Sequence, residues 1–406
     1  MSSRPIQKIL FGSPGTGKSH RLMYKIIPQK LGITDDYNIV PTIFHPEYTY
    51  GDFMGKLMPF TDEEEKVSYK YYPGHFLKAL GKAYENIISS QLDYEDKKKN
   101  TLSKYKKEID ETRQDKFTTI QKQELEQRYN LINKPKPENV VLVIDELNRG
   151  NSAAIFGSVF QLLDRDNTGW SEYTILLSDL EKQSLLKQIG LTTYPRKDTK
   201  KYEYKGKNIE QTEYNKYLNF ISDYDESENN NKINLEQGKI KIPPNFSILA
   251  TMNTSDNSIY FMDSAFKRRW DWEFVNIQDD NQRNVVSDRK IRLYNIDDVT
   301  YEDTYEWNNF VDNLNKFILS NYKTVRKIED KQIGYFFINE EIITEEHIKN
   351  KLMFFIWDSV FRNNRKPLIE LLQVDERDLV TFGQFTQKEL VIKFVKKIMD
   401  YNTVDV

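Results

Sequence analysis

Short apolar runs, divided by polar stretches that contain glycine or proline, recur along the first two thirds of the chain. Such runs are typical of strands that are buried on both faces. We therefore expect strands over residues 7–11, 39–45, 140–144 and 246–252. Apolar residues at helical spacing predict helices over residues 18–30, 75–90 and 152–164. This alternation favours an α/β fold with a parallel sheet flanked by helices.

The pattern changes towards the C-terminus. From Trp307 to Phe317, and again from Ile348 to Ile356, apolar residues recur at helical spacing. We therefore expect an α/β core over residues 1–280 and a mainly α-helical region over residues 281–406.

Two polar segments interrupt the predicted core. Residues 92–135 are highly charged and include Lys97–Lys99. We expect a solvated helical excursion there, while the basic residues leave open a contact with nucleic acid or a partner. Residues 196–237 carry several acids before Asn229–Asn231 and have the character of a surface insertion.

The composition excludes several kinds of functional site and otherwise leaves the predicted fold unchanged. The chain has 59 Lys and Arg against 62 Asp and Glu, for a net charge of −3, so it is not a polybasic protein. It has no cysteine, which excludes disulfides, iron–sulfur clusters and thiol catalysis. Four histidines make a His-rich metal site improbable.

The sequence predicts neither a membrane helix nor a signal peptide. No apolar run approaches the roughly 18–20 residues that a membrane helix needs. The N-terminus lacks the layout of a signal peptide. We expect a cytoplasmic protein that makes no membrane contact.

A phosphate-binding loop is the strongest chemical signal. Residues 12–19 (GSPGTGKS) match G-x-x-x-x-G-K-[ST] at every fixed position, between a predicted strand and a predicted helix. Backbone N–H groups of such a loop surround an anion, and the helix N-terminus adds a positive dipole end. The lysine reaches the β- and γ-phosphates and the serine hydroxyl ligates Mg²⁺. The predicted nucleotide-binding residues are Gly12, Ser13, Pro14, Gly15, Thr16, Gly17, Lys18 and Ser19.

Two carboxylates end the apolar run at residues 140–144. Two buried acids without a partner would be costly, whereas a metal ion and a water explain both. We expect Asp145 to hold Mg²⁺, usually through a water, and Glu146 to activate the attacking water as a catalytic base. Asn148 is a candidate for orienting water or contacting a neighbouring subunit. Arg149 fits an interface, a substrate contact or a pair with an acid.

The next strand and helix end in further polar groups. Because neighbouring parallel strands end at the same sheet edge, Asn253 should lie near Glu146 and hold the nucleophilic water, unless it merely caps a turn. A basic cluster, Lys267–Arg269, follows a predicted helix. Arg268 or Arg269 could stabilise the nucleotide of an adjacent subunit. The cluster could equally be placed there by the helix dipole.

With these features in place, the sequence resembles the AAA+ family of P-loop NTPases, and within it the McrB motor subunits of modification-dependent restriction systems. The resemblance covers roughly residues 7–360. The motifs that carry it are residues 44–53 (FHPEYTYGDF), 73–76 (PGHF), 145–149 (DELNR), 252–258 (MNTSDNS) and, in a region similar to the family's lid, 332–337 (QIGYFF) and 350–352 (NKL).

The resemblance implies a homo-oligomeric ring, usually hexameric, with the nucleotide between subunits. It implies Asn253 as the sensor and Arg268 or Arg269 as the residue acting in trans. It also implies GTP in place of ATP, although ATP stays open, and a McrC-like nuclease partner that stimulates hydrolysis. Ser255 and Asn257 stand where the family signature has Ala and Arg.

Three functions are compatible with these residues. The leading one is a Mg²⁺-dependent NTPase motor that serves a DNA restriction or anti-phage complex. Because the phosphate loop begins at residue 12, no room is expected for an N-terminal reader of modified DNA, so another subunit would recognise DNA. The alternatives are a MoxR-like ATPase that remodels a protein without a DNA role, and a nucleotide switch that barely hydrolyses.

Overall fold

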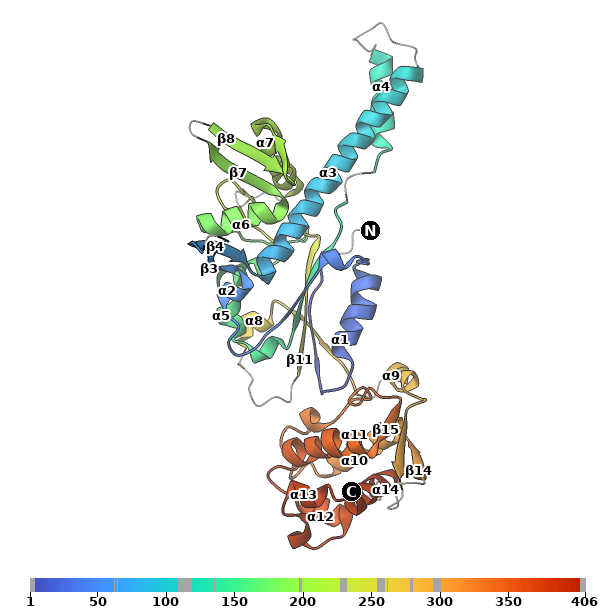
Figure 1. Ribbon diagram of the computed structural model, residues 1–406. Helices are drawn as coiled ribbons and strands as arrows, with labels where there is room; N and C mark the ends of the chain where they lie inside the picture. Colours follow the sequence, from blue (N-terminus) through green and yellow to red (C-terminus); the bar gives the residue numbers. More distant parts are fainter. Residues whose placement is uncertain are drawn as a thin grey trace. The chain divides into compact units, whose positions relative to one another are not determined.

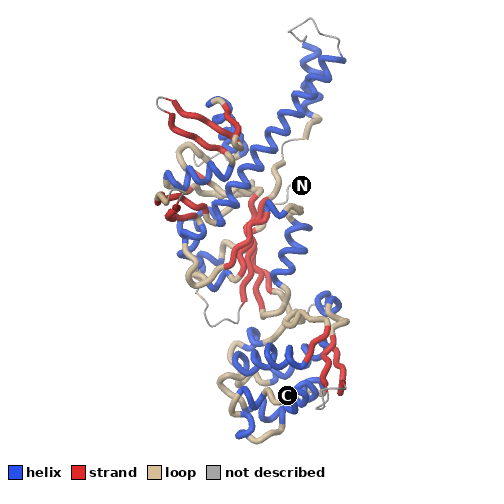
Figure 2. Tube along the Cα trace, in the orientation of Figure 1, coloured by secondary structure: helices blue, strands red, loops and turns tan. Residues whose placement is uncertain are grey.

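A five-stranded sheet flanked by helices forms the core of the α/β part of the computed structural model (Figure 2). The strand order is β12 (Asp271–Phe274), β1 (Gln7–Gly12), β11 (Phe246–Asn253), β5 (Val140–Asp145) and β2 (Ile39–Ile43). The structure describes residues 4–401 except 62, 64, 109–118, 134–135, 197–198, 227–231, 254–259, 261, 278–279 and 295–300. All four predicted strands are present, which confirms the predicted α/β fold.

Strand β5 pairs in parallel with both β11 and β2. Ala250 lies opposite Ile144, and Ile43 lies opposite Asp145. Residues 140–144 and 246–250 are buried along their whole length, as their largely apolar sequences indicate. The sheet therefore places the end of β5 next to the end of β2, at the edge where Asp145 emerges.

The chain divides into two compact units. The first comprises residues 1–8, 22–250 and 259–271, and the second comprises residues 9–21, 251–258 and 272–406. The helices of residues 18–271 are α1 (Lys18–Arg21), its π-helical continuation Leu22–Lys30, α2 (Tyr50–Phe53), α3 (His75–Glu108), α4 (Thr119–Asn130), α5 (Ser152–Phe156), α6 (Asp179–Ile189), α7 (Gln211–Tyr224) and α8 (Ser264–Lys267). Short 3₁₀ segments lie at Asp36–Asn38, Leu147–Arg149 and Gly157–Leu163. Two small pairs of strands, β3 (Gly55–Thr61) with β4 (Val67–Pro73) and β6 (Ile175–Leu176) with β10 (Lys239–Ile240), are antiparallel.

The charged excursion is a pair of helices (Figure 1). Helix α3 runs on beyond the predicted residue 90, and α4 lies beside its outer part. Tyr105 is 1% exposed, and its hydroxyl donates to Glu124 on α4 at 2.7 Å. Arg128 packs over the Tyr105 ring and pairs with Glu108. The two helices are therefore largely solvated, and a few aromatic contacts stabilise the small apolar interface between them.

Residues 191–224 fold into a layer of their own. Strands β7 (Leu191–Arg196), β8 (Thr199–Tyr204) and β9 (Lys207–Ile209) form an antiparallel sheet, and α7 follows. Helix α7 buries four side chains at helical spacing: Tyr214, Tyr217, Leu218 and Ile221. This polar segment therefore contains a folded helix, which buries its apolar face and leaves its polar face to solvent.

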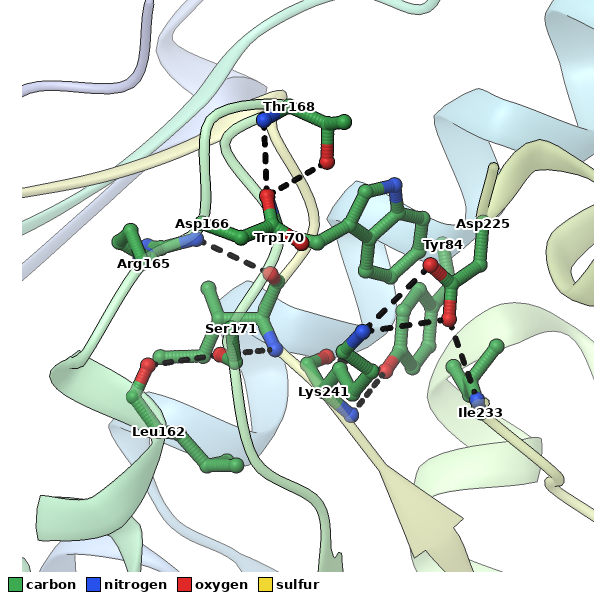
Figure 3. Close-up of polar contacts among 11 residues, drawn as sticks. Tyr84, Leu162, Arg165, Asp166, Thr168, Trp170, Ser171, Asp225, Ile233 and Lys241 are labelled. Carbon is green, nitrogen blue, oxygen red and sulfur yellow. Dashed lines mark hydrogen bonds and ion pairs between the residues drawn. The ribbon is translucent and has the colours of Figure 1, made fainter. Parts of the chain in front are cut away.

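A buried ion pair ties the end of this layer to the core (Figure 3). Lys241 Nζ lies 3.4 Å from Asp225, and the two side chains are 2% and 0% exposed. Asp225 also accepts the N–H of Ile233 at 3.2 Å. The hydroxyl of Tyr84, on α3, donates to the Lys241 carbonyl.

Arg165 is a second buried cation near this pair. It donates to the carbonyls of Gly169, Ile242, Pro243 and Phe246, and burial lowers the pKa of Arg165 to about 9.

The C-terminal part of the second unit is mainly helical, as predicted, with one small sheet. Its elements are α9 (Asp280–Val285), β13 (Lys290–Tyr294), β14 (Tyr301–Glu306), α10 (Trp307–Ser320), β15 (Ile342–Thr344), α11 (Glu345–His347), α12 (Lys366–Leu372), α13 (Phe382–Phe385) and α14 (Lys388–Met399), with π-helical segments at Ile348–Met353 and Ile356–Val360 and 3₁₀ segments at Ile328–Lys331 and Glu376–Leu379. One apolar core joins α10, the π-helical segments and α14. Among the helices of the described residues, none combines the length and apolar character that crossing a bilayer requires.

Candidate nucleotide site

The predicted phosphate loop connects strand β1 to helix α1. Three of its residues, Gly12, Gly15 and Gly17, have φ angles of 149°, 77° and 71°. These angles lie in the region that side chains rarely adopt, so the loop needs glycine at these positions. The sequence motif therefore has the strand–loop–helix setting that it requires.

Lys18 is folded back onto the loop. Its Nζ donates to the carbonyl oxygens of Gly12 at 3.0 Å and Ser13 at 2.8 Å, and the residue is 8% exposed. The Thr16 hydroxyl donates to the same Ser13 carbonyl at 3.0 Å. The ammonium charge is therefore held at the loop itself, where an anion bound by the loop would meet it.

A second segment, Gly334–Phe337, packs directly against the phosphate loop. Gly334 N–H donates to the Pro14 carbonyl, and Phe336 N–H donates to the Gly15 carbonyl, both at 2.9 Å. The Ser13 hydroxyl donates to the Glu329 carbonyl at 2.6 Å. The two backbones approach so closely that a methyl group on Gly15 would lie 2.6 Å from the Phe337 nitrogen. Nothing in the residue pattern places this segment against the loop, so sequence reasoning missed the contact.

Gly15→Ala is expected to disrupt this contact and weaken nucleotide binding. The alanine methyl meets backbone that cannot move aside, and φ at this position is +77°. Gly206→Ala is the matched control, because Gly206 has φ +76° with nothing within 4 Å of its Cβ position. Both variants carry a left-handed strain of about 1 kcal/mol or more. The thermal unfolding temperature should fall further for Gly15→Ala than for Gly206→Ala. The affinity for nucleotide should fall for Gly15→Ala only. Equal losses in the two variants would contradict the packing argument.

The acidic strand end has an unusual backbone. Asp145 ends β5, and Glu146 follows with φ 55° and ψ 45°. Left-handed geometry at a non-glycine residue costs on the order of 1–3 kcal/mol, and such residues cluster at functional sites. Arg149 N–H donates to the Glu146 carbonyl at 2.9 Å, and Arg149 Nε lies 3.5 Å from its carboxylate. Of the predicted options for Arg149, the structure shows the pair with an acid.

Asn148 lies in the 3₁₀ segment after β5, and Asn253 lies at the end of β11. Asn148 is fully buried, and its backbone carbonyl accepts the Tyr260 N–H at 3.0 Å. This burial favours a role inside the fold over a contact with a neighbouring subunit. Asn253 is the last residue of β11, which the strand order places between β1 and β5. Residues 254–258 of its motif lie outside the described residues.

The two arginines of the basic cluster have different surroundings. Asp263 caps α8 by accepting the Phe266 N–H at 2.6 Å. Arg269 then pairs with Asp164 at 2.6 Å, and its side chain is 9% exposed. Its guanidinium lies 4.0 Å from the centre of the Phe160 ring. Arg268 is exposed. Arg269 is thus engaged within its own fold, whereas Arg268 faces solvent.

Comparison with known proteins adds one long alignment. No protein-family model matches the chain. The Type II restriction enzyme BsuMI component YdiS of Bacillus subtilis (strain 168) is 28% identical over 391 residues, which cover 96% of this chain and 87% of that protein. The chain is similar to a restriction-enzyme component along nearly its whole length.

The structural comparison is weaker. The crystal structure of a proposed ATPase from Cytophaga hutchinsonii aligns with all of this chain and with 87% of that chain, at 11% identity and a TM-score of 0.27. An alignment with that score supports no inference about this protein.

Proposed function

We propose that this protein binds and hydrolyses a purine nucleoside triphosphate as the motor of a restriction complex. The observation that carries the proposal is the phosphate loop, with its three glycines at positive φ and Lys18 held at its carbonyls. Backbone N–H groups in this setting form an anion site at the start of a helix.

The residues fit a bound magnesium ion. Ser19 in the first turn of α1 and Asp145 at the end of β5 offer the oxygen ligands that Mg²⁺ prefers. Among the described residues, no group of three or more His, Cys, Asp or Glu could hold a metal by itself. Mg²⁺ typically takes one or two carboxylates and completes its shell with water and phosphate oxygens. When bound, the ion would offset charge on the phosphates.

The protein groups supply positioning and charge. Lys18 stabilises the phosphate oxygens, Glu146 accepts a proton from the attacking water, and Asn253 orients that water without adding charge. The strained backbone of Glu146 is the observation that favours it as the base.

The restriction role rests on the similarity to YdiS, which is named as a component of a restriction enzyme. A component implies further subunits. We propose a homo-oligomeric, hexameric ring in which Arg268 completes the nucleotide site of the adjacent subunit. A McrC-like nuclease partner would stimulate hydrolysis, and DNA would be contacted through the complex.

Phosphate release by the purified chain, alone and with its partner subunit, tests this proposal. Release should require Mg²⁺ and stop when EDTA removes it. Arg268→Ala should lose roughly a thousandfold or more in turnover and keep its thermal stability. Arg269→Ala should lower the unfolding temperature, because it leaves Asp164 without its partner. Release that persists in EDTA, or an Arg268→Ala variant with full turnover, would contradict the proposal.

A further inference from the structure

A pocket of about 560 Å³ lies at the layer formed by residues 191–224, within the first unit. Helix α6 leads into β7 through Gly190, and β7 is an edge strand of the small sheet (Figure 1). Residues 191–195 of β7 line the pocket together with Lys187 of α6, Lys200 of β8 and Tyr214 of α7. The volume falls within the roughly 300–1,000 Å³ of pockets that enclose a drug-sized ligand.

Strand β7 turns part of its backbone away from its own sheet. Lys205 N–H donates to the Gly190 carbonyl at 2.8 Å, which marks Gly190 and Lys205 as a hydrogen-bonded pair. Hydrogen-bonded and non-hydrogen-bonded pairs alternate along an antiparallel ladder. The register of β7 with β8 continues without a shift, so Leu191, Thr193 and Pro195 direct their backbone groups away from β8. In the described part of the chain β7 pairs with β8 alone, so these groups have no strand partner.

This edge offers both hydrogen-bond donors and acceptors. Leu191 and Thr193 each contribute an N–H and a carbonyl, whereas Pro195 contributes a carbonyl only. A bare anion such as phosphate does not suit such an edge, because the carbonyls repel it. An extended peptide suits it well, because the N–H groups and carbonyls of a strand alternate with matching spacing.

Two lysines give the pocket a positive charge. Lys187 and Lys200 are both exposed, and neither forms an ion pair with the described residues. The described lining contains no Asp or Glu. Lys201 follows Lys200 in β8 and therefore points to the opposite face of the sheet, where it pairs with Glu203 at 2.8 Å. A carboxylate bound in the pocket would thus meet two lysines whose charges are not already paired.

Tyr214 adds an uncharged hydrogen-bond donor to the lining. The residue is 7% exposed, and its ring packs against Tyr202 with the ring centres 5.0 Å apart. Its hydroxyl makes no hydrogen bond with the described residues, although polar groups this buried usually have a partner. Burial raises the pKa of Tyr214 to about 12, so the hydroxyl stays protonated. Tyr214 can therefore donate to a carboxylate or carbonyl bound in the pocket.

We propose that this pocket binds an extended acidic segment of a partner protein. The segment adds as a strand along β7 and places an Asp or Glu side chain against Lys187 and Lys200. In this mode of recognition, main-chain hydrogen bonds supply affinity and pockets for alternate side chains supply specificity. The same lysines disfavour the pairing of two copies of this chain through β7, because like charges would meet. The site lies outside the nucleotide pocket and does not depend on the function proposed above.

Fluorescence polarisation of a labelled peptide, Thr-Val-Glu-Val-Thr, mixed with the full chain tests the proposal. The wild-type chain should bind this peptide roughly tenfold or more tightly than Thr-Val-Lys-Val-Thr. Two N-methylated versions test strand addition, one methylated at both valines and the other at the glutamate and the last threonine. Only one of them should lose binding, because alternate N–H groups of a strand point to the same neighbour. Loss of binding in both versions, or in neither, would show that the peptide does not add to β7.

Charge reversal locates the site on the chain. The double variant Lys187→Glu with Lys200→Glu should prefer the lysine peptide over the glutamate peptide, and its fold should survive because both lysines are exposed. Lys201→Glu is the matched control, since it makes the same change on the opposite face of β8 and should leave the preference unchanged. An unchanged preference in the double variant, or a reversed one in Lys201→Glu, would place the peptide elsewhere and overturn the assignment.

Competitors separate a peptide site from the other occupants of a basic pocket. Free glutamate and a short oligothymidylate should each displace the labelled peptide far less well than the unlabelled peptide does. Equal displacement by glutamate would show a site for small anions, and equal displacement by the oligonucleotide would show a nucleic-acid surface. Either result, or no binding of the acidic peptide at all, would overturn the proposal.

Discussion

Replacing Glu146 by glutamine is expected to lower the turnover of nucleoside triphosphate roughly 10²–10⁴-fold, while the affinity for nucleotide stays close to wild type. The amide keeps the size of the side chain and removes its ability to take a proton from water. Glutamine can occupy the left-handed backbone position of Glu146 about as well as glutamate does, so the fold should be unaffected. Single-turnover phosphate release and calorimetric binding measure the two quantities separately.

Glu126→Gln is the matched control for this change. Glu126 is an exposed residue of α4, so the same substitution there should leave turnover unchanged. Wild-type turnover in Glu146→Gln would show that another group activates the water. Loss of binding together with turnover would show that Glu146 acts mainly on the fold or on nucleotide uptake.

Lys241→Met should lower the free energy of unfolding by about 3–5 kcal/mol, because it leaves the Asp225 carboxylate buried without its counter-charge. Asp225→Asn should be similarly costly, since it leaves the lysine ammonium buried. Chemical denaturation of the full chain, followed by circular dichroism, measures both effects. If unfolding of this large protein proves irreversible, unfolding rates at one temperature rank the variants instead.

The double variant Lys241→Met with Asp225→Asn makes this prediction specific. It removes both charges and keeps an oxygen that can accept the Ile233 N–H. Its cost should therefore be clearly smaller than the sum of the two single costs. Lys366→Met removes the lysine of an exposed pair with Glu370 and should change stability by less than about 1 kcal/mol. Additive costs in the double variant would refute a coupled buried pair.

The parts of the fold that follow a simple residue pattern could be predicted from the sequence. The run at residues 140–144 is continuous and apolar, the run at residues 246–252 is mostly apolar, and the two proved to pair as buried parallel strands. The phosphate loop could be placed because its glycines and lysine have fixed spacing. Element ends were less predictable: α3 continues to Glu108 because aromatic contacts with α4 support a charged helix.

Features that depend on residues distant in sequence could not be predicted. The segment 196–237 is polar on average, yet α7 buries one face that includes Ile221. No local pattern pairs Arg269 with Asp164, a contact that distinguishes it from Arg268. The contact of Gly334 with the phosphate loop likewise joins residues far apart in the chain. The assigned roles in catalysis and magnesium binding stay predictions.

Nucleotide uptake tests the central claim most directly. Titration of the full chain with GTP and with ATP in the presence of Mg²⁺ should show binding of at least one of them. Lys18→Ala should weaken that binding tenfold or more, since it removes the charged donor at the loop. A chain that takes up no purine triphosphate, or one whose affinity is unchanged in Lys18→Ala, would contradict the account.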